Sequence, residues 1–592
     1  DDLNSDVLVN IISYLNVLDG SRLSQTSRRM FYFVHEYPKV LGPQVVGASS
    51  ILDDQQRQQQ RQRLQPPKSE YDPILEQAMK QLRTKPNIAF WFHCDYPFFP
   101  RIHKVQETHT RIPPSTVVVG TISADIQANI PHEQQPMSDG INSSLLLGSF
   151  SRENTRIVPF AFQQRTMSSM KEAVHSWVSN ELEEPAHNTH NDDDEDDDDD
   201  DNYWKVFVVY ACDQMQTESF VQQLQSKYPH AAIVGGFCRQ GYVSLLKDHN
   251  QETSSGGGEG GATRKSPRLS SSSRSSNSTT TTTTTNSIYE ICEIKSGIFG
   301  VAMGGDVPIQ SIVSRGVQSI LPRPPKISTT ITPPPPPSSS SSSFQTPWTI
   351  HSSFLSKPSD RDTYPFRTGC SSGKETPVHI IQKFQNTHTK EILSPVEMMQ
   401  TTLGRTNEPP DFVGICRPGE DGYQLLQRFG LHGGEFLVLT DGSDFQVESL
   451  QEAAINFFAL DGEASCVDME VTLDKLQKAS SLNDDVLLGA IMFSCNGRGP
   501  TAGHFIAEDM ADANRFFNKF PHVPCCGFYA GGEIGPRALA GNENVFQRGH
   551  AAVQGFTAVF AVFVVPKNPI HYHLDDSPEN IKQYVRTKLL AS

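Results

Sequence analysis

The sequence predicts a mixed α/β protein whose folded parts are interrupted by long polar insertions. One observation is a succession of strand, turn, helix, strand and turn over residues 486–536. A similar succession over residues 204–236 ends in Gly-Gly. The third observation is a set of Gln-, Asp-, Ser-, Thr- and Pro-rich tracts between the apolar segments. Such tracts cannot bury enough apolar surface to offset the entropy lost on ordering, so we expect disordered insertions.

The stretch FPHVPCCGFYAGGEIGP, residues 520–536, is predicted to end an apolar strand in a glycine turn. Gly531 and Gly532 lack Cβ, so the backbone there can turn tightly or approach a ligand. Glu533 lies at the mouth of the turn, which Gly535 and Pro536 are expected to end. A carboxylate in that place suits the anchoring of a polar ligand. The alternative, which spacing alone favours, is that Glu533 only satisfies nearby backbone N–H groups.

A second stretch, VLLGAIMFSC at residues 486–495, is almost continuously apolar, as is typical of a strand covered on both faces. It runs into a glycine turn at residues 496–500, and residues 508–520 between the two strands have the spacing of an amphipathic helix. If the two strands are parallel, both turns open on one edge of the sheet. The predicted ligand or substrate pocket then consists of Cys495, Asn496, Gly497, Arg498, Gly499, Tyr529, Gly531, Gly532 and Glu533.

These two stretches, through MFSCNGRG and FPHVPCCGFYAGGEIGP, resemble the C-terminal half of a FIST domain, the module named for F-box and intracellular signal transduction. Three shorter motifs resemble its N-terminal half. They are VGG at 234–236, GVAMGGDVP at 300–308 and SRGVQ at 314–318. Strands that end in Gly-Gly recur in both halves, which suggests two related halves facing one another.

The N-terminal segment carries an apolar stripe with helical spacing and is too short to bury a core by itself. It resembles an F-box over roughly residues 2–42, with departures at Asn4, Gly20 and Met30-Phe31. The alternative is a helical hairpin packed on its own chain. The resemblance implies a surface for a Skp-family adaptor made of Leu3, Val7, Leu8, Ile11, Ile12, Leu15 and Leu18.

The expected organisation follows from these motifs and from the composition of the segments between them. It is an all-helical F-box at 1–45, a Gln/Arg-rich linker at 46–84, a FIST N-terminal half at 85–320 with disordered insertions at about 184–202 and 250–287, a Pro/Ser-rich disordered linker at 321–377, a FIST C-terminal half at 378–565 and a polar tail at 566–592.

Within the two halves, short apolar runs bounded by glycine or polar residues are predicted to be strands, and longer runs with helical spacing to be helices. The expected strands are 87–92, 115–119, 156–162, 204–211, 231–234, 298–303, 309–313, 378–384, 412–416, 435–439 and 553–565, the last broken by Gly555. The expected helices lie around Phe220, at 395–399, 450–458 and 471–479, and in the tail at 578–590.

Composition excludes several classes of function. The acidic run at 192–201 supplies ten of the charges behind the net charge of -17, and nothing is basic enough to indicate nucleic-acid binding. We expect no membrane segment, because no apolar run of about 20 residues occurs. The sequence has no glycine-rich phosphate loop and no metal-ligand spacing, so we expect neither a cofactor nor a metal. Ten irregularly spaced cysteines are typical of reduced thiols, and we expect a cytoplasmic or nuclear protein.

Cysteine chemistry is the remaining catalytic hypothesis. A nucleophilic cysteine needs a base within reach and a lowered pKa. Arg498 is expected to lower the pKa of Cys495 and make it the most reactive thiol, whereas nothing fixes His504 beside it. Cys525 and Cys526 are adjacent in a strand, so they point to opposite faces and are predicted to be buried structural residues.

The resemblance implies a non-catalytic substrate-recognition subunit of a Skp-cullin-F-box ubiquitin ligase. Its helices would bind a Skp-family adaptor and through it a cullin scaffold, and its FIST domain would present a protein substrate for ubiquitination and degradation. The alternative is an intracellular sensor of a small, amino-acid-like ligand with a non-functional F-box. A cysteine-dependent enzyme is the third hypothesis, and turnover lost in Cys495→Ala would identify it.

Overall fold

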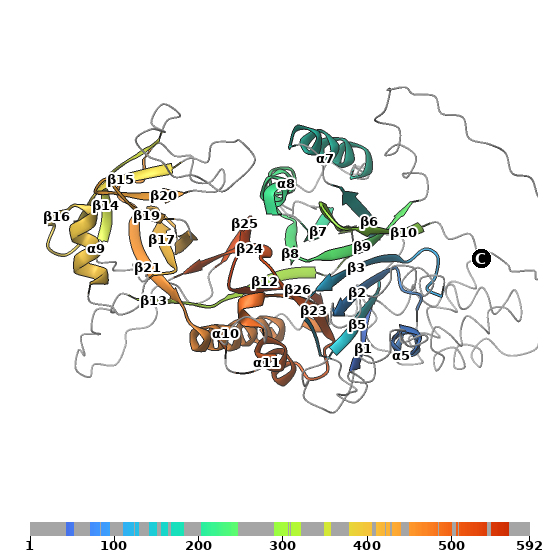
Figure 1. Ribbon diagram of the computed structural model, residues 1–592. Helices are drawn as coiled ribbons and strands as arrows, with labels where there is room; N and C mark the ends of the chain where they lie inside the picture. The colour runs from blue at the N-terminus through green and yellow to red at the C-terminus, as the bar shows by residue number, and fades with distance from the viewer. Residues whose placement is uncertain are drawn as a thin grey trace, which may run out of the picture.

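The computed structural model describes a set of ranges in which strands predominate and form three mixed sheets (Figure 1). The mixed α/β class is therefore confirmed. The described residues are 43–51, 71–82, 84–94, 111–123, 125–129, 141–150, 155–163, 167–182, 203–212, 214–246, 289–305, 307, 309–320, 348–356, 378–404, 410–420, 422–426, 429–439, 449–482, 485–499, 505–506, 508, 510–540 and 546–566.

The first two sheets pack on each other around the largest hydrophobic core. The six-stranded sheet has the order β1 (Gln44–Ile51), β5 (Ile141–Ser149), β2 (Ile88–Cys94), β3 (Val117–Ser123), β9 (Gln240–Leu246) and β10 (Tyr289–Ile294). The five-stranded sheet has the order β12 (Ile309–Arg315), β26 (Thr557–Pro566), β22 (Asp485–Cys495), β23 (Cys525–Ala530) and β4 (Ile126–Asn129).

Strand β2 shows how these layers are built from the alternation of its side chains. Phe90 and Phe92 belong to the main core, where the rings of Phe92 and Phe528 lie 5.9 Å apart. Ala89 and Trp91 point the other way, into a separate cluster with helix α5 (Tyr71–Gln81). Both faces of β2 are thus buried, which explains its almost unbroken apolar sequence.

The third sheet has fifteen strands and runs from one end of the molecule to the other. Its main path is β19 (Phe429–His432), β20 (Glu435–Leu439), β15 (Val378–Asn386), β14 (Trp348–Leu355), β21 (Ala454–Leu460), β17 (Phe412–Cys416), β18 (Tyr423–Leu426), β24 (Glu533–Ala540), β8 (Ala232–Phe237), β7 (Trp204–Ala211), β11 (Ile298–Gly305) and β6 (Thr155–Phe162). Off this path, β13 (Val317–Ser319) pairs with β21, β16 (Ile392–Leu393) with β15, and β25 (Phe546–Gln554) with β24.

Two parallel strand pairs with a helix in each connection lie at the centre. Strands β22 and β23 run parallel, with Cys495 opposite Ala530, and α11 (Ala511–Lys519) connects them. Strands β7 and β8 run parallel, with Ala211 opposite Phe237, and α8 (Gln214–Lys227) connects them. The prediction that the turns after β22 and β23 open on one edge of the sheet is confirmed.

The chain crosses twice between the five-stranded and the fifteen-stranded sheet, each time through two residues. Gly531-Gly532 links β23 to β24, and Gly555-Phe556 links β25 to β26. At the first crossing β24 pairs with β8, and Glu533 lies opposite Gly236. The Gly-Gly strand end at residues 235–236 and the Gly-Gly turn at residues 531–532 are therefore neighbours in the fold.

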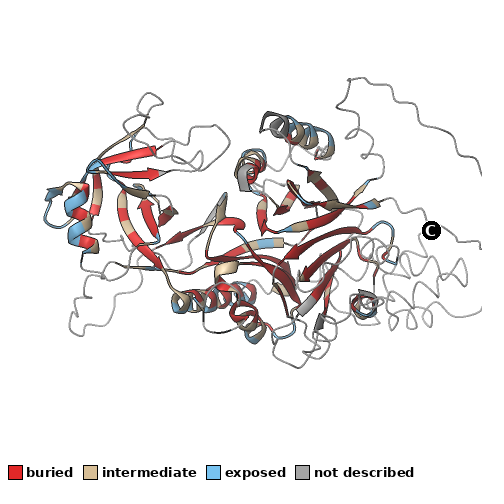
Figure 2. Cartoon of the chain, viewed as in Figure 1, coloured by how far each residue is buried: buried red, intermediate tan, exposed pale blue. Residues whose placement is uncertain are grey.

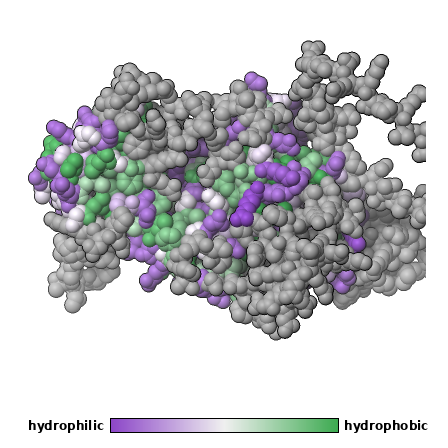
Figure 3. Space-filling model, viewed as in Figure 1, coloured by the Kyte–Doolittle hydropathy of each residue, from purple (hydrophilic) through white to green (hydrophobic). Residues whose placement is uncertain are grey.

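Strands β13 to β21 form a lobe on the left of Figure 1, with α9 (Pro395–Leu403) on its outer side. The lobe has its own hydrophobic cluster around Phe384, Phe436 and Phe457. Figure 2 shows this division of burial, with strand interiors red and the outer side of α9 blue. In Figure 3 hydrophobic and hydrophilic residues are intermixed over the lobe. Scattered apolar residues are ordinary on a folded surface, so they indicate no interface by themselves.

The remaining helices are α7 (Met167–Glu181), α10 (Gly462–Leu482) and the short 3₁₀ turn η5 (Asn496–Arg498). Helix α9 begins as the sequence dictates. Ser394 accepts from the Glu397 N–H, the Glu397 carboxylate accepts from the Ser394 N–H, and Pro395 occupies the first turn.

Several predicted elements are confirmed and three are wrong. Strands β7, β17 and β20 match their predicted ranges, α10 covers the helix predicted at 471–479, and α11 lies within the one predicted at 508–520. The helix predicted at 450–458 does not form: residues 454–458 begin β21 and are paired with β17, and residues 450–453 form a turn before it. Residues 553–565 are broken at Gly555 as predicted, but they do not belong to one sheet, because the parts before and after Gly555-Phe556 lie in two strands of two different sheets. Gly535 and Pro536 lie inside β24 and do not end the turn.

The linkers predicted at 46–84 and 321–377 also need correction. Most of β1 and all of α5 lie in the first, and β14 lies in the second, paired with β15. These three elements are short apolar segments between long polar tracts, so the composition of the surrounding sequence led to their being assigned to linkers. The F-box residues up to 42, the insertions at 184–202 and 250–287, and the tail helix at 578–590 lie outside the described residues. Of the helices that the structure describes, none is long and apolar enough to span a bilayer.

Candidate functional site

Glu533 is the first residue of β24 and lies where the two sheet crossings meet. Its Oε2 accepts hydrogen bonds from the Thr557 backbone N–H at 3.1 Å and from the Thr557 hydroxyl at 2.9 Å. Thr557 begins β26, just after the second crossing. The carboxyl therefore ties one crossing to the other. This satisfies the prediction that Glu533 bonds to nearby backbone, but it uses only one of the two oxygens.

The protonation of Glu533 follows from its burial. The residue is 0% exposed, and burial raises the pKa of its carboxyl to about 8, although the hydrogen bonds from Thr557 act in the lowering direction. At neutral pH the group is therefore mainly a neutral acid that can donate a hydrogen bond. Its Oε1 atom is buried and accepts no hydrogen bond from an N–H or O–H group of the described residues, and the neighbouring Cys495 thiol is only a weak donor. Such an atom is the kind that a ligand or water satisfies.

Cys495, the last residue of β22, lies beside the Glu533 carboxyl. Burial, and then the negative charge of Glu533, raise the pKa of its thiol to about 12, while backbone hydrogen bonds from Gly497 and Phe556 act more weakly in the other direction. The expectation that Arg498 makes Cys495 the most reactive thiol is therefore wrong. A thiol with so high a pKa holds almost no thiolate at neutral pH, so it is a poor nucleophile.

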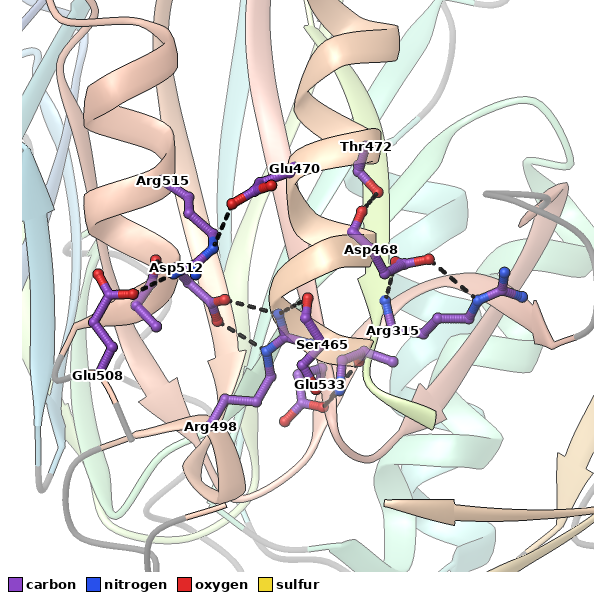
Figure 4. A network of polar contacts seen from close by, with 12 residues as sticks. Arg315, Ser465, Asp468, Glu470, Thr472, Arg498, Glu508, Asp512, Arg515 and Glu533 are labelled. Carbon is purple, nitrogen blue, oxygen red and sulfur yellow. Dashed lines mark hydrogen bonds and ion pairs between the residues drawn. The ribbon is translucent and has the colours of Figure 1, made fainter. Parts of the chain in front are cut away.

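Arg498 has a different role because its guanidinium is already paired (Figure 4). Its Nε and Nη2 donate to the two carboxylate oxygens of Asp512 at 2.9 and 2.7 Å, and Nη2 lies 3.4 Å from the Ser465 carbonyl. The side chains of Arg498 and Asp512 are 0% and 1% exposed. This two-point contact holds the turn η5 against the start of α11. Arg498 thus fixes the backbone beside the site, and its positive charge is largely balanced by the carboxylate of Asp512.

Helix α10 extends this polar network across the base of the site. Asp468 accepts from the Arg315 backbone N–H at 2.8 Å, and Arg315 Nε lies 3.5 Å from the same carboxylate. Lys519 of α11 contacts Asp474 of α10. Figure 4 shows polar pairs on both sides of α10, between β12 and α11. The network joins α10 to β12 and α11. These contacts, made outside the site itself, fix the positions of the elements that carry the site residues.

Three of the four predicted glycines allow close approach, each to a different aromatic side chain. A Cβ on Gly532 would lie 2.8 Å from the Phe237 ring, and one on Gly499 would lie 2.8 Å from Tyr529. A Cβ on Gly497 would lie 3.0 Å from the Phe556 ring. Gly531 is exposed and has no neighbour closer than 3.7 Å to such a Cβ. The glycines therefore bring aromatic rings against the turns, and Gly531 marks the side open to solvent.

Phe556 carries backbone strain at the site. Its φ is +60°, which is unusual for a bulky residue, and its side chain is 4% exposed. The ring also lies 5.5 Å from Phe505, edge to face. Strain of this kind persists only where the surroundings impose it, and it gathers at functional sites. Phe556 was missed in the sequence because Gly555 was interpreted as a break within one strand and not as a crossing between two sheets.

The structure brings most of the predicted site residues together and leaves unsatisfied polar atoms between them. Three of the buried atoms without an oxygen or nitrogen hydrogen-bond partner among the described residues are Glu533 Oε1, Asn496 Oδ1 and Arg498 Nη1. Tyr529 differs from the others, because its ring is buried in the main core and its hydroxyl lies 3.8 Å from the sulfur of Met510. His504 lies outside the described residues. Cys525 and Cys526 are buried in β23, as predicted.

Two partners of the site residues were not predicted. Thr557 and Asp512 look like ordinary polar residues at the ends of predicted elements, and only the folded arrangement pairs them with Glu533 and Arg498. A usable signal for Asp512 was its place in the first turn of an amphipathic helix, where a carboxylate is favoured. In the described part of the chain, no group of three His, Cys, Asp or Glu side chains is arranged to hold a metal.

Comparison with known proteins identifies one domain. Residues 444–536, from just before β21 to the middle of β24, match the model of the FIST C domain. No F-box match and no match to the N-terminal FIST domain accompanies it. The matched region contains η5, α11, Cys495, Arg498 and Glu533, but not Thr557.

The chain also resembles curated bacterial proteins over part of its length. The chain is 33% identical over 112 residues to uncharacterized proteins of Mycobacterium tuberculosis strains CDC 1551 / Oshkosh and ATCC 25618 / H37Rv, and to one of Mycobacterium bovis. The similarity covers 19% of this chain and 25% of each relative, so the chain spans about a quarter of the length of the curated relatives it matches. The segment that holds both turns, residues 444–536, is a FIST C domain.

Proposed function

We propose that the FIST C domain binds a small, amino-acid-like ligand at Glu533 and that the chain acts as a non-catalytic sensor in signal transduction. The observation that carries this proposal is the buried Glu533 carboxyl, which uses Oε2 for Thr557 and leaves Oε1 without an oxygen or nitrogen hydrogen-bond partner among the described residues. The orphaned Asn496 Oδ1 and the exposed Gly531 nearby support it. Small-ligand sites combine an apolar lining with a few such polar groups.

The proton on Glu533 gives the proposal a measurable consequence. An ammonium group placed beside the carboxyl favours its charged form, so binding of an amino acid should expel the proton. Affinity should then rise with pH until it approaches the pKa of about 8. Calorimetric titration in two buffers that differ in ionisation enthalpy measures the proton release directly. A ligand that binds with no proton release would not be contacting Glu533 through an ammonium group.

The direct test is a thermal-shift screen of amino acids against the wild type and Glu533→Gln. The glutamine keeps an acceptor for Thr557, so the fold should persist while the ligand-induced shift is lost. Glu463→Gln, in the first turn of α10, is the matched control and should bind as the wild type does. If Glu533→Gln loses stability and no amino acid shifts the wild type, Glu533 has only a structural role.

A second candidate function rests on the sequence of residues 1–45. Their resemblance to an F-box supports the proposal that the chain is the substrate receptor of a Skp-cullin-F-box ubiquitin ligase, in the cytoplasm or nucleus, with the folded module presenting a protein substrate. This proposal is tested by co-purification with a Skp-family adaptor, beside an Ile11→Asp/Leu15→Asp variant. Binding that the variant loses supports a ligase subunit. Binding by neither leaves the sensor as the function of the chain.

A further inference from the structure

A hollow lies along β8, at the end away from Glu533. Strand β24 pairs with β8 at only two positions, Glu533 with Gly236 and Ile534 with Gly235. Pro536 follows, and proline has no N–H with which to extend the pairing. Where β24 leaves β8, a cavity of about 300 Å³ opens. Its lining comes from six elements or their ends and consists of Trp204, Lys205, Gln225, His230, Ala231, Ala232, Ile233, Ile309, Gln310, Ser311, Pro536, His550 and Ala551.

All the ionisable side chains in this lining are basic. It contains Lys205, His230 and His550 and no acidic residue, although the chain as a whole carries a net charge of -17. No hydrogen bond or ion pair joins these three side chains to other described residues. A lysine without a carboxylate partner in a concave site creates a local positive potential. An anion is therefore the complementary occupant.

The walls supply the other features of a ligand site. Gln310 and Ser311 of β12 offer hydrogen-bond donors from the side opposite β8, and Ile233 and Ile309 offer apolar surface. The volume lies at the lower end of the range for small-molecule sites. The anionic group of a small organic ligand would thus contact Lys205, and its short carbon skeleton would contact the two isoleucines.

The walls are also held in place without a ligand. Gln225 of α8 accepts from the Ala551 backbone N–H at 2.9 Å, which ties α8 to β25 across the cavity rim. The indole N–H of Trp204 donates to the Leu182 carbonyl at 3.1 Å. A preformed site loses less ordering free energy on binding.

From this arrangement we propose that the cavity between β8, β12 and β25 binds a small organic anion that carries a carboxylate or phosphate group, with Lys205 as the principal charge partner. The site is separate from Glu533, because β8 contacts Glu533 through Gly236 at its other end. The proposal therefore does not depend on the sensor function. Two ligand sites at the two ends of β8 would share that strand.

The test is calorimetric titration of the full chain with inorganic phosphate and with succinate, each at an ionic strength matched with sodium chloride. Succinamide is the neutral probe of the same skeleton. We expect saturable binding of at least one anion and none of succinamide. Lys205→Met should weaken binding about tenfold or more, as expected for the loss of a charged hydrogen bond. Gln310→Glu, at an exposed position, should abolish it by placing a negative charge in the lining.

Two control variants distinguish binding in this cavity from a general effect of protein charge and from binding at Glu533. Lys227→Met removes a positive charge from the exposed last turn of α8, outside the cavity, and should leave the affinity unchanged. Glu533→Gln should also leave it unchanged, so failure of the sensor proposal would not affect this result. The proposal is overturned if no anion binds saturably, or if Lys227→Met weakens binding as much as Lys205→Met. Because Gln310→Glu alters only an exposed side chain, the test holds even if Lys205→Met does not fold.

Discussion

At the scale of single residues, two buried ionisable groups in the FIST C domain are stabilised in opposite ways. Arg498 remains charged, because Asp512 lies within 2.7 Å and the pair excludes water. Glu533 forms no ion pair with a cation among the described residues, so burial raises its pKa and favours the neutral acid. One group therefore contributes a buried ion pair and the other a pH-dependent term to the free energy of unfolding.

The ion pair predicts a large effect of removing one partner. Arg498→Met should lower the free energy of unfolding by about 3–5 kcal/mol, because Asp512 is left buried without its cation. Arg515→Met is the matched control. Its partners Glu508 and Glu470 are 47% and 64% exposed, so its loss should cost less than about 1 kcal/mol. Urea unfolding measures both. Equal losses would mean that Arg498 is not tied to Asp512 in solution.

The raised pKa of Glu533 predicts how stability depends on pH. Between the ordinary carboxyl value of 4.5 and about 8, the folded protein holds a proton that the unfolded chain has released. The contribution of Glu533 to stability is thus fully present below pH 4.5 and is lost as pH rises to about 8. Glu533→Gln should remove this slope, worth on the order of a few kcal/mol across the window. Chemical unfolding of both proteins at pH 5, 6.5 and 8 measures the difference. Parallel curves would show that Glu533 is ionised in the folded state.

At the scale of elements, the fold depends on how closely β8 approaches its neighbours. Gly235 has φ of +153°, and a Cβ there would lie 1.7 Å from the Val209 carbonyl oxygen. A Cβ on Gly236 would lie 2.7 Å from that of Ala530, in the strand that leads to Gly531. These glycines let the parallel pair β7–β8 pack against the crossing that presents Glu533.

This close approach predicts that replacement by alanine destabilises the protein far more at one glycine with positive φ than at another. Gly235→Ala should destabilise the protein by several kcal/mol or prevent folding, because backbone atoms would have to move. Gly419→Ala, with φ of +89° and nothing within 4 Å of the added carbon, should cost only about 1 kcal/mol of backbone strain. Thermal unfolding of the two variants compares them. A mild effect of Gly235→Ala would contradict the packing of β8 on β7.

Secondary structure could be predicted from the sequence where an element is buried evenly along its length. The prediction failed where pairing with a distant strand determines whether a segment is helix or strand. Strands β7 and β22 are apolar over most of their length because both their faces are largely covered, so their ranges or types were predictable. Residues 450–458 carry no such pattern, and only pairing with β17 makes part of them a strand. The meeting of Cys495, Arg498 and Glu533 was predictable from parallel strands. Their chemistry was not, because it depends on Asp512 and Thr557, which other elements contribute.

At the scale of the whole molecule, the lobe formed by β13 to β21 and the body are joined through few strand pairings. Strand β18 pairs with β24 at only two positions, Tyr423 with Ala540 and Gln424 with Leu539. The lobe core around Phe436 and the main core around Phe493 are separate clusters. Segments with separate cores can unfold independently when the interface between them is small.

This division predicts two unfolding transitions in the full chain. Phe436→Ala should lower the free energy of unfolding of the lobe alone, and Phe493→Ala that of the body alone. Each loss should be about 3–5 kcal/mol, because removing a buried ring leaves a cavity. Scanning calorimetry resolves the transitions, and hydrogen exchange assigns each to its strands. A ligand at Glu533 or at the cavity beside β8 should raise only the body transition, because both sites lie in the body. If either variant lowers both transitions equally, the fifteen-stranded sheet transmits unfolding through β18 and β24, and the lobe is part of one cooperative unit.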